Sequence, residues 1–256
     1  MDVKLFISTP CYDAMMTMQY TISLLKLINI LNQTNIQFVI DFTGNESLIP
    51  RARNNSLGKF MESNFTHFFF IDSDIEFSPE AVLDLIKFDK DVVCCSYAKK
   101  GYNWKRLIYS MQNDSQSKES LDSRGLDFAY NAMHDEDKKL IRKDNFLKVS
   151  HASTGFMMIK RDILEKLYKK HTELMITTSG LSNKDSELCG LFCCMIKDKV
   201  YLSEDYSFCE RVNNIGGEVW LNIYHNLNHI GKHSFKSDIK NRSYLGRSQS
   251  ERMFYE

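Results

Sequence analysis

The sequence lacks an excess of charge of either sign. Its 256 residues contain 33 lysines and arginines and 33 aspartates and glutamates. Proteins that bind nucleic acid or an anionic membrane surface rely on a field of positive charge, and this composition supplies none. The balance disfavours a polyanion-binding protein, and we expect no nucleic-acid partner.

The sequence also lacks a cysteine framework and a long apolar run. Its seven cysteines are odd in number and scattered, without a C-x-x-C pair, which argues against a zinc ribbon or a disulfide scaffold. No basic N-terminal region precedes an apolar core, and no run approaches the length of a bilayer span. We therefore expect a cytoplasmic protein with reduced thiols and no transmembrane segment.

Short apolar runs alternate with segments of helical periodicity through the first hundred residues. Strands are predicted at residues 3–8, 36–42, 68–71 and 91–97, and helices at 14–31, 50–62 and 79–87. This alternation is typical of an α/β fold with a mostly parallel central sheet flanked by helices. Because the chain has 256 residues and no visible repeat, we expect one domain over residues 1–256.

The pattern weakens after residue 100. Residues 112–124 and 134–144 are polar or charged and are expected to be solvated loops. Order returns at residues 148–161, with later helices predicted at 162–169 and 204–214 and a strand at 218–223. Within the first helix, apolar residues at helical spacing predict the face that packs on the core, namely Met18, Ile22, Leu25, Ile28 and Leu31.

Two aspartates follow directly after the apolar run at residues 68–71. If the chain continues extended there, Asp72 and Asp74 point the same way, toward the open end of the sheet where α/β proteins bind ligands. Carboxylate oxygens suit Mg²⁺ or Mn²⁺, which takes phosphate oxygens as further ligands. The alternative is a solvated turn before the next helix, and the D-x-D pattern alone does not decide between the two.

Four motifs in order resemble one enzyme family. They are Asp72-Ser73-Asp74, Ser153-Thr154-Gly155-Phe156, Ser203-Glu204-Asp205-Tyr206 and His229-Ile230-Gly231. Over residues 3–233 their order and spacing resemble the nucleotide-sugar-dependent glycosyltransferases of the GT-A fold, of a family-2-like kind. The Asn- and Lys-containing composition is also similar to that of glycosyltransferases from large DNA viruses and phages.

The resemblance implies transfer of a sugar from a nucleoside-diphosphate sugar, with UDP favoured, to a hydroxyl of a glycan, protein or small-molecule acceptor. Mn²⁺ or Mg²⁺, held by Asp72, Asp74 and His229, would stabilise the negative charge that grows on the leaving diphosphate. A structural role for His229 stays open. The implied division is a nucleotide-binding half at 1–100, an acceptor and catalytic half at 101–233, and a tail at 234–256.

The acidic pair at the predicted helix start supplies the catalytic candidates. The resemblance implies that Asp205 is the general base of an inverting reaction and that Glu204 contacts the acceptor or supports the site. A plain helix cap is the alternative, because acids are favoured at helix starts in any case.

The resemblance also implies a set of donor-binding residues. Thr9, Pro10 and Tyr12 would cradle the base, Asp41 and Thr43 would read its edge, and Arg53 would meet the diphosphate or sugar. Ser73, Gly155 and Lys232 complete the set, since Gly155 lets the backbone approach the sugar and Lys232 can touch the phosphates. Lys99, Lys100, Tyr102 and Trp104 follow the fourth predicted strand and could hold the donor or stack on a sugar ring, although Trp104 could equally pack in the core.

The sequence leaves other functions open besides an inverting glycosyltransferase. A retaining glycosyltransferase on the same fold and a non-catalytic carbohydrate-binding relative are both alternatives. A sugar-1-phosphate nucleotidyltransferase is disfavoured, because residues 8–13 contain neither the glycine nor the lysine of its phosphate loop.

Overall fold

A twelve-stranded mixed sheet forms the centre of the protein. The computed structural model describes residues 3–113, 121–178 and 186–236. The strand order along the main path is β2-β1-β3-β10-β5-β15-β9-β7. Six of these eight strands run in one direction, and only β10 and β9 are reversed. The predicted α/β fold with a mostly parallel sheet is therefore confirmed.

The bounds of the elements are as follows. The helices are α1 (Met18–Leu31), α2 (Ile49–Met61), α3 (Pro79–Phe88), α4 (Trp104–Asn113), α5 (Leu121–Arg124), α6 (Arg161–Lys170) and α7 (Glu204–Asn214). The main-path strands are β1 (Lys4–Cys11), β2 (Gln37–Gly44), β3 (His67–Ile71), β5 (Val92–Tyr102), β7 (Tyr130–Ala132), β9 (Phe146–Ala152), β10 (Phe156–Lys160) and β15 (Val219–Ile230). Shorter strands join the same sheet, namely β4 (Ile75–Glu76), β6 (Leu126–Phe128), β8 (Arg142–Lys143) and β16 (Ser234–Lys236). Two hairpins lie outside it, β11 (Met175–Thr178) with β12 (Ser186–Cys189) and β13 (Met195–Lys197) with β14 (Val200–Leu202).

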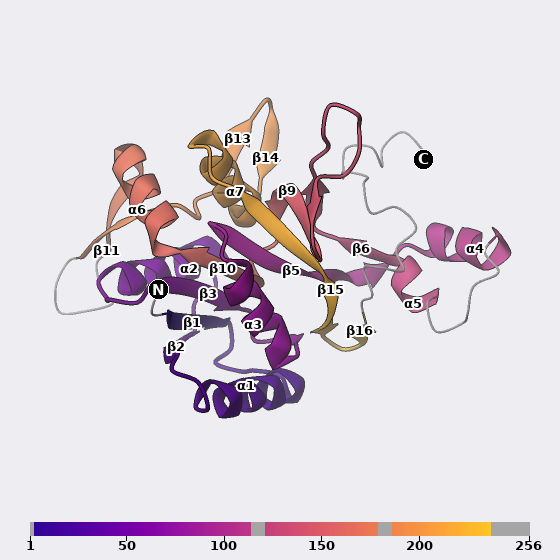
Figure 1. The fold of residues 1–256 in the computed structure, drawn as a ribbon, viewed down its shortest axis with the longest axis horizontal. Helices are drawn as coiled ribbons and strands as arrows, with labels where there is room; N and C mark the ends of the chain where they lie inside the picture. Colours follow the sequence, from indigo (N-terminus) through magenta and orange to yellow (C-terminus); the bar gives the residue numbers. More distant parts are fainter. Residues whose placement is uncertain (1–2, 114–120, 179–185, 237–256) are drawn as a thin grey trace.

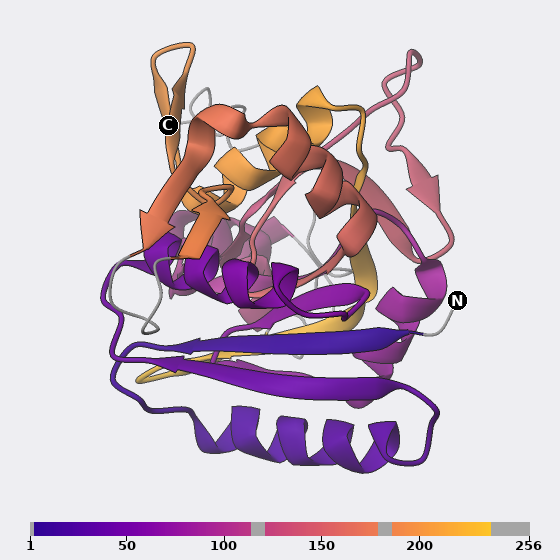
Figure 2. The same cartoon turned by 90° about the vertical axis from the view of Figure 1, so that its left-hand side faces the viewer.

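Helices cover both faces of the sheet. Residues of α1 and α3 form one core cluster with the sheet, and residues of α2, α6 and α7 form the other. Figure 2 shows the edge of these layers, with α1 on one side of β1 and β2 and α2 on the other. In β3, Phe68 and Phe70 belong to one cluster and Phe69 and Ile71 to the other, because successive side chains of a strand point to opposite faces. The continuous apolar run of this strand thus reflects burial on both faces.

The predicted buried face of the first helix is correct for Ile28 and Leu31, which pack in or against the core, and wrong for the other three residues. Met18, Ile22 and Leu25 are 69%, 44% and 60% exposed. Besides Leu31, the helix buries Tyr20, Ser23, Leu24 and Leu27. Polar side chains belong to this inner face because each finds a partner there: the Tyr20 hydroxyl lies 2.6 Å from Thr9 Oγ1, and Ser23 Oγ accepts from the Phe77 amide. Spacing alone could not choose between two apolar faces.

The region after residue 100 is more ordered than the sequence indicated. The expectation of a loop over residues 112–124 is wrong at both ends, where α4 and α5 lie, while residues 114–120 lie outside the described part of the chain. Beyond it, Leu126, Phe128 and Tyr130 are fully buried and extend the core. Of the solvated loop expected at residues 134–144, residues 134–139 are exposed, but Arg142–Lys143 form the strand β8, which pairs with β9.

Three predicted helices and the late predicted strand agree with the structure. The helices expected at residues 50–62, 79–87 and 204–214 correspond to α2, α3 and α7, and the late strand is longer than expected, reaching Ile230 as β15. In Figure 1, β15 crosses the molecule beside β5, with which it pairs in parallel. Among the described residues, no helix is long and apolar enough to cross a bilayer.

Candidate functional site

The chain turns sharply after β3. Asp72 donates its amide to the Gly155 carbonyl at 2.9 Å, and its own carbonyl accepts from the Ile75 amide at 3.1 Å, which closes a turn over residues 72–75. The extended conformation predicted for the two aspartates is therefore wrong. Because of the turn, the carboxylates of Asp72 and Asp74 contact different partners instead of sharing one position.

Asp74 lies between two basic side chains from different strands. Its Oδ2 accepts a hydrogen bond from Lys100 Nζ of β5, and its Oδ1 lies 3.4 Å from Nε2 of His229 of β15. The main chain is fixed as well, since the Ile230 amide donates to the Asp74 carbonyl at 2.8 Å. Burial works against ionisation, but the contacts with His229 and Lys100 outweigh it and hold the pKa of Asp74 below its ordinary value.

The orientation of His229 determines which of its ring nitrogens donates a hydrogen bond and which one faces Asp74. Its Nδ1 lies 2.8 Å from the Ala98 carbonyl, which can only accept, so Nδ1 carries the proton and donates. In the neutral ring, Nε2 then presents a lone pair to the carboxylate of Asp74. That contact becomes attractive when a proton or a cation lies between the two atoms.

The donor set fits a divalent cation. A carboxylate oxygen and a neutral imidazole whose other nitrogen is held by a carbonyl are common metal ligands. Two ligands at right angles, each about 2.1 Å from one ion, lie about 3 Å apart, close to the 3.4 Å between His229 and Asp74. Within the described residues no three His, Cys, Asp or Glu side chains converge on a metal position. The predicted trio is thus present as the pair Asp74 and His229, with Asp72 elsewhere.

Asp72 belongs to a second cluster built around a buried arginine. Arg53 Nη2 lies 3.1 Å from Asp72 Oδ1 and 3.3 Å from Oδ2, and Arg53 Nε lies 3.5 Å from Glu204 Oε1. The arginine is only 4% exposed, and its guanidinium lies over the Phe70 ring at 4.9 Å. Burial works against its charge, but Asp72 and Glu204 hold the pKa of Arg53 above its ordinary value. Arg53 therefore links the end of β3 to the start of α7.

Gly155 lies where side chains approach the backbone closely. Its amide donates to the Tyr97 hydroxyl at 3.0 Å. A Cβ on Gly155 would lie 2.6 Å from Asp72 Oδ2 and closer still to the Tyr97 hydroxyl. The glycine thus makes room for Asp72 and Tyr97, which is a different reason from the close sugar approach that the sequence suggested.

The predicted acidic pair opens α7. Glu204 and Asp205 are the first two helical residues after Ser203, which is the N-cap by position but gives no side-chain cap bond. Asp205 Oδ1 accepts from the Ser203 hydroxyl and from the Tyr206 amide at 2.8 Å. Glu204 faces Arg53 instead. The two neighbouring carboxylates are therefore set apart, one beside a buried cation and one beside neutral donors.

The residues predicted to contact the nucleotide base lie at the ends of β1 and β2. Pro10 pairs with Thr43 across these strands, and Tyr12, just beyond β1, is exposed. The side chain of Thr9 is buried against Tyr20. In the neighbouring strand, Asp41 and Thr43 bond to α2, through Lys59 at 2.8 Å and Ser56 at 3.0 Å respectively.

The two remaining predicted donor residues take different positions. Ser73 lies in the turn after β3, and its carbonyl accepts from the Thr17 amide at 2.9 Å, which ties the turn to the start of α1. Lys232 is exposed in the connection between β15 and β16, three residues after His229 in sequence. Neither position is closed off by the surrounding core.

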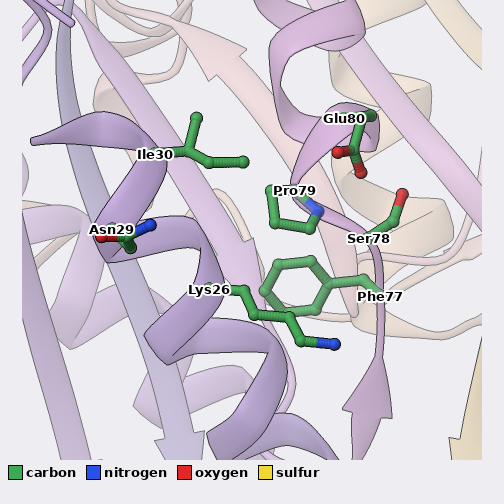
Figure 3. A pocket seen from close by; sticks show the side chains of 7 residues that line it. All are labelled: Lys26, Asn29, Ile30, Phe77, Ser78, Pro79 and Glu80. Atoms are coloured by element: carbon green, nitrogen blue, oxygen red, sulfur yellow. The ribbon is translucent and has the colours of Figure 1, made fainter. Parts of the chain in front are cut away.

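A pocket of about 350 Å³ lies apart from these residues. It sits between α1 and the start of α3 (Figure 3) and is lined by Lys26, Asn29, Ile30, Phe77, Ser78, Pro79 and Glu80. None of the residues predicted for the site lines it. The candidate site is therefore the pair of carboxylate clusters and not this pocket.

Sequence reasoning missed Tyr97 and misjudged the environment of Arg53. Tyr97 ends a predicted strand and reads as a core residue, yet its hydroxyl bonds the Gly155 amide beside Asp72. Arg53 is charged and lies in a helix, so nothing in the sequence indicates that it is buried. Lys100 was a candidate for holding the donor, and the structure adds its contact with Asp74. Only the fold brings these strands and α2 together.

No protein-family model and no curated protein matches the chain. Among solved structures it is similar to A197 from STIV, at 17% identity and a TM-score of 0.45, over 96% of this chain and 98% of that one. It is also similar to GalNAc-T7 with UDP, GalNAc and Mn²⁺, at 10% identity and a TM-score of 0.41, over 90% of this chain but 44% of that one. A third is the inositol-1-phosphate CTP transferase from T. maritima, at 9% identity and a TM-score of 0.40, over 98% of this chain and 93% of that one.

At the level of the fold, the resemblance to the GT-A class agrees with the mixed sheet and its two helical layers. At these identities and scores, the roles of individual residues follow from the geometry of this chain alone.

Proposed function

We propose that the protein is a metal-dependent glycosyltransferase that moves a sugar from a nucleoside-diphosphate sugar, UDP favoured, to an acceptor hydroxyl with inversion. The observation that carries the proposal is the contact of Asp74 with His229, whose protonated Nδ1 faces Ala98 and whose Nε2 faces the carboxylate. This pair lies at the end of the sheet where α/β folds bind ligands. The motif resemblance names the substrate class.

The proposed division of labour follows the two clusters. Asp74 and His229 would hold Mn²⁺ or Mg²⁺, which when bound neutralises the charge that develops on a diphosphate leaving group. Asp72, paired with Arg53, would support the site from beside the ion. Lys232 is exposed and close in sequence to His229, where its ammonium can meet phosphate oxygens.

Asp205 is the better candidate for the general base. Glu204 faces the buried Arg53 and is engaged in an ion pair with it. Asp205 is held by neutral donors, the Ser203 hydroxyl and the Tyr206 amide, and both of these bonds go to Oδ1. Its Oδ2 is then the oxygen that takes the proton from the acceptor hydroxyl as that oxygen attacks the anomeric carbon.

The proposal extends to the organisation of the chain. Residues 1–100 would bind the donor and residues 101–233 would complete the acceptor side, with the tail at 234–256 falling mostly outside the described residues. Arg53 with Glu204 and Asp74 with His229 both join the two halves. We propose that the protein acts in the cytoplasm, without nucleic acid, on a glycan, protein or small-molecule acceptor.

The test is the variant Asp205→Asn, which keeps size and much of the capping ability. Donor affinity should survive, because the diphosphate is met at the other cluster, whereas turnover should fall on the order of 10²–10⁴-fold. Donor affinity by calorimetry, transfer rate and the anomeric configuration of the product are measured together. Asp162→Asn is the matched control, because Asp162 occupies the first turn of α6, and it should leave transfer unchanged.

Near-normal transfer by Asp205→Asn would make this residue a helix cap. A product that retains the donor's configuration would contradict the single displacement even if the variant were inactive. Failure of wild-type protein to hydrolyse or transfer from any nucleotide sugar would favour the non-catalytic carbohydrate-binding alternative.

A further inference from the structure

Lys100 lies over the backbone of the turn that follows β15. Its Nζ bonds Asp74 Oδ2 while its side chain is 38% exposed. A Cβ placed on Gly231 would lie 3.3 Å from Lys100 Cδ and 3.5 Å from Cε. The absence of a side chain at Gly231 therefore lets the lysine stem run along the backbone to reach the carboxylate.

The three members of this cluster are fixed relative to one another. The short strand β4 pairs with the end of β15, with Ile75 opposite His229, and the Ile230 amide holds the Asp74 carbonyl. One carboxylate is thus shared, with His229 at Oδ1 and Lys100 at Oδ2. A cation bound between Asp74 and His229 would lie close to the ammonium of Lys100.

Charge determines what this arrangement does. The charges of Asp74 and Lys100 sum to zero, and the nearby carboxylate of Asp72 is already paired with Arg53. A divalent cation alone would therefore bind beside Asp74 and Lys100, whose charges cancel, and next to a like-charged ammonium, in a partly buried site where such repulsion is screened less than in water. A diphosphate reverses this, because its oxygens attract the cation and the ammonium at once.

We propose that Lys100 couples the two ligands: it opposes a divalent cation that binds alone and becomes a phosphate ligand when a diphosphate is present. This inference rests on the proposed function and extends it. Without ligands the lysine also keeps Asp74 paired, so the turn after β3 stays in place. Cation and diphosphate then bind as a unit, and neither occupies the site readily by itself.

The test measures binding of Mn²⁺ alone, of pyrophosphate alone and of pyrophosphate with Mn²⁺, by calorimetry and by the electron paramagnetic resonance signal of free Mn²⁺. In wild-type protein, pyrophosphate should tighten Mn²⁺ about 10–100-fold, and Mn²⁺ should tighten pyrophosphate by the same factor. Lys100→Met should bind Mn²⁺ alone about tenfold more tightly and pyrophosphate with Mn²⁺ about tenfold more weakly. The opposite signs are diagnostic, because a merely structural loss would weaken both ligands.

Two controls separate local charge from other effects. Lys166→Met removes the same charge from an exposed position of α6 and should change neither affinity. Lys100→Arg keeps the charge and should retain most of the coupling between Mn²⁺ and pyrophosphate. This variant also allows a test if Lys100→Met does not fold.

The outcomes distinguish the inference from the proposed function. If wild-type protein binds both ligands but Lys100→Met holds Mn²⁺ no more tightly, the coupling role of Lys100 is wrong while the glycosyltransferase proposal stands. If wild-type protein binds neither Mn²⁺ nor pyrophosphate in any combination, both are wrong.

Discussion

Two carboxylates near opposite ends of the β5–β15 pair both accept from lysine, Glu218 from two and Asp74 from one, and their other partners differ. Glu218, just before β15, accepts from Lys148 at 2.7 Å, from Lys90 at 3.0 Å and from the Trp220 ring nitrogen at 3.2 Å. Asp74, near the other end, accepts from Lys100 and lies 3.4 Å from Nε2 of His229, whose Nδ1 faces the Ala98 carbonyl. Glu218 accepts from three donors, whereas Asp74 has one lysine donor and an imidazole nitrogen that is able to bind a cation.

Under the proposed function, this difference separates a structural ion cluster from a ligand site. A carboxylate whose lone pairs are filled by donors gains stability and has little reason to bind a cation. A carboxylate beside a ring nitrogen with a free lone pair gains from a cation that binds both atoms. The two carboxylate side chains are equally exposed, at 29%, but Glu218 is paired with two lysines and Asp74 with one lysine and a histidine, so the partners distinguish the two positions.

The largest expected effect is the loss of thermal stability when Arg53, which is buried between two carboxylates, is replaced. Arg53→Met leaves Asp72 and Glu204 without their shared cation, and breaking a buried pair in this way costs about 3–5 kcal/mol. For a chain of this size, that lowers the melting temperature by roughly 10 °C. Calorimetric melting of the variant measures the loss.

Arg51→Met is the matched control in the same helix, because the Arg51 side chain is 60% exposed in its pair with Glu46. An exposed pair contributes at most about 1 kcal/mol, so this variant should melt close to wild type. Equal melting temperatures for the two variants would show that Arg53 does not hold the clusters together.

The next effect compares Asp74 with Glu218 directly. Asp74→Ala should weaken Mn²⁺-dependent donor binding on the order of 100-fold, about 2.7 kcal/mol, because the cation loses a ligand. Glu218→Ala should leave donor affinity unchanged and lower thermal stability, since Lys90 and Lys148 lose their common partner. Donor titration and thermal melting of both variants measure this crossed pattern. Equal donor affinities would remove the distinction between the clusters.

The smallest effect is the pH dependence contributed by Glu218. The hydrogen bond from Lys148, together with those from Lys90 and Trp220 and against the effect of burial, lowers the pKa of Glu218 from 4.5 to about 2. A carboxyl group with a lowered pKa stabilises the fold above its unfolded value and loses that contribution as the pH falls through its folded value. Urea unfolding of wild type and Glu218→Gln should therefore differ most above pH 4.5 and converge toward pH 2. A constant difference across this range would contradict the assignment.

The sequence by itself determined the alternation of elements and the location of the candidate motifs. The run at 68–71 specified a strand buried on both faces, and Ser78-Pro79 marked the start of α3, because burial and proline geometry act within a few residues. The acidic pair at 204–205 was likewise placed correctly at a helix start. The substrate class implied by the order of the four motifs stays a prediction.

The tertiary structure alone decided which charges meet. Because of the turn closed by Asp72 and Ile75, Asp72 contacts Arg53, whereas Asp74 contacts Lys100 and His229. The antiparallel strand β10 lies beside β3, so that Gly155 lies against both Asp72 and Tyr97. It also decided which apolar face of α1 is buried, since the bonds of Tyr20 and Ser23 select the inner one. Local sequence encodes backbone preference and periodicity, but a contact between residues 53 and 204 depends on strand order and helix packing, which involve the whole chain at once.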